Sequence, residues 1–192
     1  MADDGPFNFS AAMGALMADM AATCQPLRHV DMGRVAVAFA QARHRRLDGM
    51  LAATYPLRFE GGATTAQMDG HTYRMPRVVV GGREMLYVVS FALPRFLDLP
   101  FEEKLAVVAH ELYHIGPRFD GALRRFAGSK PYHTASQRRY DAAMARLALR
   151  YVDRTRRPGL QAFLRRTFGE LVEAHGGVVG VRVRNLDARR VD

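Results

Sequence analysis

The chain has 192 residues, 48% of them hydrophobic, which is enough for one domain with a substantial core. No apolar run approaches the ~20 residues needed to cross a bilayer, and the acidic N-terminus, with no basic residue before Arg28, has the wrong charge for a signal peptide. Cys24 is the only cysteine, so an intrachain disulfide is excluded and a reducing cytoplasm fits best.

The first half of the chain predicts a helix followed by strands. A helix is expected over 10–23, and weakly patterned strands over 35–40 and 51–59. The clearest β signal is two β-rich runs, 77–80 and 84–91, around the pair Gly81-Gly82. Such a two-glycine turn predicts a β-hairpin.

The second half predicts mainly helices. Pro100, Glu102 and Glu103 favour a helix start, and Gly116-Pro117 stops that helix, which leaves a helical stretch over 103–115. Further helices are expected over 136–152 and 160–174, the latter ended by Gly176-Gly177. A short terminal strand is expected over 178–183.

The helix over 103–115 carries the most informative stretch of the chain, His110-Glu111-Leu112-Tyr113-His114. This is the His-Glu-x-x-His pattern of zinc-dependent hydrolases. At about 100° per residue, four apolar side chains share one face of the helix and the two histidines lie almost opposite it. The apolar face consists of Leu105, Val108, Leu112 and Ile115.

The spacing of the motif explains the chemistry that it favours. Residues four apart on a helix can bring two imidazoles to one metal ion at about 2.0–2.1 Å from each nitrogen. Glu111 is displaced from His110 and His114, so it can accept a proton from the water that the metal activates. The alternative is that these are two ordinary surface histidines on an amphipathic helix.

A catalytic zinc needs a third protein ligand and an open position. The candidates downstream are Asp120, His133, Asp141, Glu170, Glu173 and His175. His133 is favoured because it lies just before the helix expected over 136–152. Asp120 is the rival, at the offset of the third ligand in HExxHxxGxxH, although Pro117 occupies the glycine position of that pattern. Without a metal, His133 would be a loop histidine and Asp120 a turn residue.

Several short segments together resemble a known family. They are His110-Glu111-Leu112-Tyr113-His114-Ile115, then Phe119-Asp120-Gly121, then His133 and Tyr140-Asp141. They resemble the putative phage metallopeptidase family, which is similar to the SprT/Spartan-like zincins, and the resemblance covers residues 28–152. It implies peptidase chemistry, with His110, His114 and His133 on zinc and Glu111 as general base.

The order of elements predicts an α+β, zincin-like fold. We expect an N-terminal helix, a small antiparallel sheet, the HExxH helix and further C-terminal helices. The organisation expected is an N-terminal helical segment (1–27), a zincin-like metallopeptidase domain (28–152) and a C-terminal helix and strand packed on that domain (153–192). The strand over 84–91 is either the cleft edge that binds an extended peptide or an interior strand.

The charge of the chain is uneven. Between residues 118 and 157 lie eleven basic and three acidic residues, so this segment holds most of the net charge of +9. It makes nucleic acid a candidate partner, whereas scattered arginines on helices are more commonly a solvated face.

Three functions are therefore compatible with the sequence. The first is a zinc metalloendopeptidase acting on protein or peptide substrates, with no membrane partner. The alternative is a basic nucleic-acid-associated protein with a degenerate or structural zinc site. The third is a metal-dependent hydrolase of non-peptide amides, which the same ligands would serve.

Overall fold

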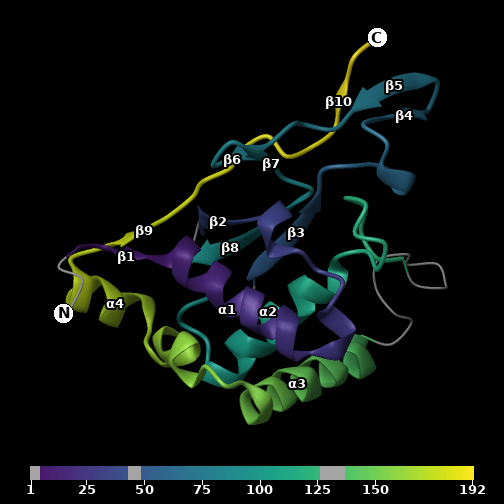
Figure 1. Cartoon of the computed structure of the whole chain (residues 1–192). Helices are drawn as coiled ribbons and strands as arrows, with labels where there is room; N and C mark the ends of the chain where they lie inside the picture. The colour runs from purple at the N-terminus through teal and green to yellow at the C-terminus, as the bar shows by residue number, and fades with distance from the viewer. Residues whose placement is uncertain (1–4, 43–48, 126–136) are drawn as a thin grey trace.

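A three-stranded sheet in the order β2-β8-β3 forms the centre of the fold (Figure 1). The structure, a computed structural model, describes residues 5–42, 49–125 and 137–192. The central strand β8 (Tyr87–Leu93) runs parallel to β2 (Val35–Gln41) and antiparallel to β3 (Ala52–Pro56). The sheet is therefore mixed, and the prediction of a purely antiparallel sheet was wrong. The connection from β2 to β8 is more than forty residues long, which is ample for a parallel pairing.

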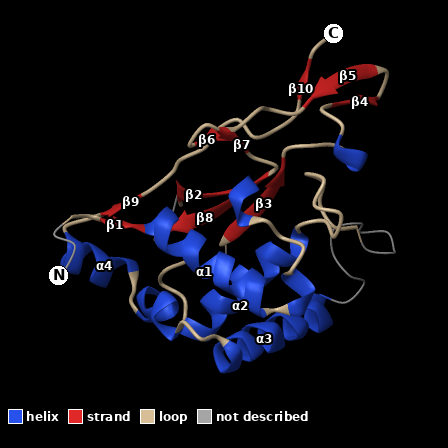
Figure 2. Ribbon diagram, in the orientation of Figure 1, coloured by secondary structure: helices blue, strands red, loops and turns tan. Residues whose placement is uncertain are grey.

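The two faces of this sheet carry different layers. Val37 and Phe39 of β2 point into the main core, whereas Ala36 and Ala38 point into a second, smaller cluster. Helices lie together on the first side of the sheet, and loops with short strands cover the second (Figure 2). The alternation of side chains along β2 and β8 thus divides the molecule into a helical layer and an irregular layer.

The helical layer is built from α1 (Phe9–Thr23) and α2 (Phe101–His114), with α3 (Gln137–Arg154) packed against α2. The side chain of Asn8 caps α1 by accepting a hydrogen bond from the Ala11 amide at 3.0 Å. The buried side of α1 is rich in methionine, and it includes Met13, Leu16, Met17 and Met20, all with 0% exposure. The predicted helices over 10–23 and 103–115 are therefore confirmed.

The C-terminal helical region is divided, so the single helix expected over 160–174 was wrong. A 3-10 helix, η4 (Pro158–Arg165), ends at Arg166, whose backbone is extended. Thr167 then starts α4 (Phe168–His175) with a reciprocal capping box to Glu170, which defines a new helix start. Gly176 ends α4 in the left-handed conformation with φ 70°, as its position predicted.

The predicted hairpin at Gly81-Gly82 is confirmed, but only over two short strands. β6 (Val79–Val80) pairs with β7 (Arg83–Glu84), and both glycines have positive φ. The second β-rich run then leaves the hairpin at Met85 and continues as β8. Because β8 lies between β2 and β3, the interior interpretation of this run was right and the cleft-edge interpretation was wrong.

Several short strands were not predicted. β4 (Thr65–Met68) and β5 (His71–Arg74) form a hairpin whose turn residues, Asp69 and Gly70, both have positive φ. Asp-Gly is a recognised hairpin signal, so this element could have been found in the sequence. β10 (Arg189–Arg190) extends the same sheet beside β5.

Two segments that are far apart in the sequence also form a strand pair. β1 (Phe7–Asn8) pairs in parallel with β9 (Val178–Val179). The terminal strand expected over 178–183 therefore forms only in part, although Val181 adds an isolated bridge to Ala38. Three further 3-10 turns complete the described structure: η1 (Gln25–Leu27), η2 (Met32–Arg34) and η3 (Glu60–Gly62).

The C-terminal region packs on the same core as the helical layer. Lys104 of α2 is 2% exposed, and its ammonium donates to the carbonyl oxygens of Leu164 (2.9 Å) and Arg166 (2.8 Å). The division at residues 27 and 152 stays a prediction. Across the described ranges, no helix combines the length and the apolar character that a membrane crossing requires.

Candidate metal centre

Helix α2 positions the His-Glu-x-x-His motif between the sheet and α3. Its buried face consists of Leu105, Val108, Ala109 and Leu112, each at most 1% exposed. Glu102 and Glu103 place negative charge in the first turn, where the helix dipole favours it. The helix ends at Ile115, which is extended and fully buried. The apolar pattern therefore fixes the rotation of α2, and with it the direction of the motif.

The two motif histidines converge. The Nε2 atoms of His110 and His114 lie 2.8 Å apart, and the ring centroids are separated by 4.6 Å. His114 is buried at 8% exposure, whereas His110 is half-buried. Their spacing of four residues thus brings two nitrogen donors to one point, as the sequence predicts.

This pair fits a metal ion of the zinc type. Tetrahedral ligation at 2.0–2.1 Å would hold two nitrogens about 3.3–3.4 Å apart, so a small separation of the two rings would admit the ion. Imidazole nitrogen is also among the preferred donors for zinc. Within the described residues, however, no group of three histidine, cysteine, aspartate or glutamate side chains could hold a metal. The described part of the chain therefore brings together two candidate ligands and no third.

Glu111, which follows His110 in the helix, lies in an environment that excludes almost all solvent. It is only 5% exposed, and burial raises the pKa of its carboxyl from 4.5 to about 7, against the opposing effect of hydrogen bonds from Thr54. The Thr54 hydroxyl lies 2.7 Å from Glu111 Oε2 and 2.9 Å from the Glu111 carbonyl oxygen. A carboxyl with a pKa near 7 is suited to exchange protons at neutral pH.

Thr54 reaches Glu111 because of the register of the sheet. It lies in β3 opposite Val89 of β8, whose side chain belongs to the helical side of the sheet. β3 also contacts α2 and is an edge strand, paired only with β8 in the described structure. Thr54 was predicted only as part of the strand expected over 51–59, and no local pattern singled it out as a functional residue.

Tyr140 of α3 covers the histidine pair from the other side. Its ring centroid lies 4.8 Å from that of His110 and 6.1 Å from that of His114. Tyr140 is 4% exposed, and its pKa is raised by burial and then by the nearby charge of Glu111. Tyr140 of α3 therefore partly covers the face of α2 that carries the two histidines.

The candidates for the third ligand lie in different places. His133 lies outside the described residues. The Asp120 carboxylate accepts a hydrogen bond from the Ala122 amide at 3.1 Å, which is the turn role considered for it. Asp120, Asp141, Glu170, Glu173 and His175 are all described, and none completes a three-ligand group with the pair. A further histidine, His29, has Nε2 at 3.2 Å from the Ile115 carbonyl oxygen and does not complete one either.

The loop after α2 is fixed to the sheet and borders a groove. The Tyr87 hydroxyl donates to the Ala122 carbonyl oxygen at 2.8 Å and accepts from the Gly121 amide at 3.0 Å. The groove has a volume of about 690 Å³, and Tyr113 of the motif lines it together with Pro56, at the end of β3. The edge strand β3, the motif helix α2 and this groove thus lie next to one another.

Described arginines of the basic segment over 118–157, among them Arg124 and Arg125, line the groove beside the motif helix. Arg124 lies 4.0 Å from the centroid of the Tyr113 ring and donates to the Tyr113 carbonyl oxygen at 2.7 Å. Arg125 pairs with Glu60 at 3.1 Å, and both side chains are exposed. These contacts are structural, and neither the fold nor the comparisons below support nucleic acid as a partner of this segment.

Comparison with models of known protein families assigns a family to this chain. A sequence model of the family described as putative phage metallopeptidase matches residues 15–144, about two thirds of the chain. It includes the motif helix, His133 and the first part of α3. Comparisons with curated proteins and with solved structures gave no match.

Proposed function

The chain belongs to the putative phage metallopeptidase family, and we propose that it is a zinc-dependent endopeptidase. In this proposal His110, His114 and His133 hold the metal, and Glu111 is the general base. The observation that carries it is the 2.8 Å approach of the His110 and His114 Nε2 atoms, together with the burial of Glu111, which follows His110 in the helix. The alternative of two ordinary surface histidines does not account for a buried acid in the same turn of the helix.

The zinc ion, when bound, would polarise the substrate carbonyl and increase the acidity of the attacking water. Glu111 takes the proton from that water as it attacks and passes it to the amine of the leaving peptide. The Thr54 hydroxyl holds one oxygen of the Glu111 carboxyl, which leaves the other oxygen for the proton transfer. Thr54 is therefore a positioning residue, because it acts through Glu111.

An extended substrate would be held by β3. Within the described ranges the outer edge of β3 pairs with no other strand, so its backbone donors and acceptors could bind a peptide as a further strand of the sheet. Because Thr54 joins β3 to Glu111, such a peptide would pass close to the general base. In this proposal β3 binds the extended peptide at the edge of the cleft, the role that the sequence analysis considered for residues 84–91.

Metal content and hydrolysis test the proposal together. Wild-type protein should bind about one zinc per chain, and His133→Ala should lose it or bind it much more weakly. His71→Ala is the matched control, because His71 lies in β5 and faces Asp192 at 3.7 Å. Glu111→Gln should retain zinc but lose cleavage of unfolded casein.

Three outcomes would contradict this assignment. Equal zinc in wild type and His133→Ala would remove His133 from the ligand set. Undiminished hydrolysis by Glu111→Gln would remove Glu111 as base. Absence of zinc from the wild type after reconstitution would refute the metal centre itself.

A further inference from the structure

The face of the central sheet that points away from α2 bears a second groove. Val78 and Val80 from one segment, and Val181 and Val183 from another, pack on the small cluster around Ala36, Ala38 and Val88. The space between these two segments is a groove of about 690 Å³. Since α2 packs on the opposite face, this groove is distinct from the candidate metal centre.

Arginines line the groove because half-buried and exposed side chains alternate along the two segments that form it. In Val181-Arg182-Val183-Arg184 the valines are half-buried and the arginines are exposed, as expected for extended chain on an apolar layer. Arg77 precedes Val78 in the same manner on the facing segment. Five arginines in all line the groove: Arg74, Arg77, Arg182, Arg184 and Arg189.

These arginines have few carboxylates to neutralise them. No aspartate or glutamate is among the residues that line the groove. Arg77 reaches Glu84 at 3.5 Å, and Arg182 lies over the Phe39 ring at 5.0 Å from its centroid. Across the described ranges, Arg74, Arg184 and Arg189 take part in no salt bridge. The groove therefore concentrates positive charge.

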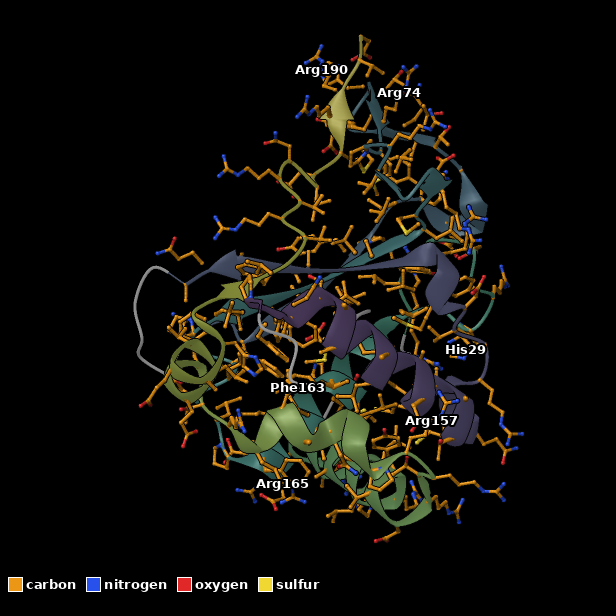
Figure 3. The ribbon with its side chains drawn as sticks, turned by 60° about the vertical axis from the view of Figure 1, so that its left-hand side comes forward. His29, Arg74, Arg157, Phe163, Arg165 and Arg190 are labelled. Carbon is orange, nitrogen blue, oxygen red and sulfur yellow. The ribbon has the colours of Figure 1, made fainter. Side chains whose placement is uncertain are left out.

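Two of the arginines are held next to each other by the backbone. Arg74 of β5 and Arg189 of β10 are direct partners in the antiparallel register. Like charges opposite each other in a sheet are destabilising, so this pairing has a cost that a bound anion would remove. Arg74 and Arg190 mark this end of the molecule, well away from Arg157 and Arg165 on the helical side (Figure 3).

The groove also exposes apolar surface. Val79 is 49% exposed and Val191 46% exposed, and both line it with Met75 and Pro76. No aromatic side chain is among its lining residues, so it lacks the stacking platforms on which single-stranded nucleic acids bind. Guanidinium groups bind carboxylates in a bidentate manner, and valines accept aliphatic side chains.

We propose that this arginine groove binds an extended acidic peptide segment of another protein, one that alternates carboxylate and aliphatic side chains. Its carboxylates pair with Arg74, Arg184 and Arg189, and its aliphatic side chains contact Val79 and Val191. A groove of this volume is within the range of ligand-binding sites. Because it lies across the sheet from α2, it recruits a protein without occupying the metal centre.

Binding of a defined peptide to the full chain tests this inference. The probe is a fluorescent eight-residue peptide of alternating glutamate and valine, compared with a serine–valine peptide of the same length and with an eight-residue oligothymidylate. The triple variant Arg74→Ser, Arg184→Ser, Arg189→Ser should bind the acidic peptide at least about tenfold more weakly. The matched control, with the same charge change on α3, is Arg138→Ser, Arg146→Ser, Arg150→Ser, and it should retain binding.

A measurement on the wild type makes the test independent of how the variants fold. In NMR spectra of the wild-type protein, the acidic peptide should shift amide signals of 74–80 and 181–191 and leave those of α2 unchanged. Equal weakening in both triple variants would overturn the proposal, because binding would then follow net charge alone. Failure of the acidic peptide to bind would overturn it too, as would tighter binding of oligothymidylate that the groove variant abolishes. None of these results depends on zinc or on hydrolysis.

Discussion

Replacing Glu111 by glutamine should stabilise the metal-free protein at pH 8 and change its stability little at pH 4.5. Burial holds the pKa of the Glu111 carboxyl at about 7 in the folded protein, against an ordinary value of 4.5. The unfolded chain loses this proton near pH 4.5, whereas the folded chain keeps it until about pH 7. The free energy of unfolding therefore falls as the pH rises through this window, and the loss is complete by pH 8.

The size of the effect follows from these two pKa values. Each pH unit between them corresponds to about 1.4 kcal/mol, so the ionised Glu111 costs the folded state about 3–4 kcal/mol at pH 8. At pH 4.5 the same difference is below about 0.5 kcal/mol, because only half of the unfolded chains are ionised there. Glutamine has nearly the same shape, carries no charge, and keeps an oxygen that accepts from Thr54.

Urea unfolding of wild-type protein and Glu111→Gln, both in excess chelator, measures this difference at the two pH values. The comparison within one pH cancels the titration of every other group. A stability gain that is equal at pH 4.5 and pH 8, or a loss of stability at pH 8, would refute the argument that Glu111 is desolvated at its position. A gain confined to the higher pH would show that this acid is retained at a cost to stability.

Other parts of the structure give three further expectations. Thr54→Val should lower kcat for peptide hydrolysis by about tenfold or more with little change in KM, because it removes the hydroxyl that holds Glu111. Thr54→Ser keeps a hydroxyl and should retain most activity. Equal losses of activity in both variants would show that only the packing of the side chain matters. Lys104→Met should destabilise the fold by about 1–3 kcal/mol in urea unfolding, since two carbonyl oxygens lose their buried donor, and an unchanged midpoint would contradict this. Tyr87→Phe should cost about 1–2 kcal/mol and loosen the loop after α2, measured as faster amide exchange at Gly121, whose amide loses its acceptor.

The helices and the motif could be predicted because their information is local. The apolar face of α2 and the spacing of His110 and His114 are properties of a few adjacent residues, and the helix geometry then dictates where the side chains point. The glycine pair at 81–82 likewise specifies its own turn. For the same reason the capping box at Thr167 was readable in principle, yet a continuous apolar pattern concealed it.

Tertiary structure decided what depends on distant pairings. The residues of β8 do not by themselves predict that it lies between β2 and β3, because the strand order follows from which apolar faces can be buried together. Thr54 meets Glu111 across 57 residues only because the register of β3 turns its side chain toward α2. The arginine groove has the same origin: Arg74 and Arg189 are far apart in the chain and become neighbours only when β10 joins β5. The sequence alone thus determined the helix that carries the candidate metal ligands, and the packing of the sheet determined what surrounds it.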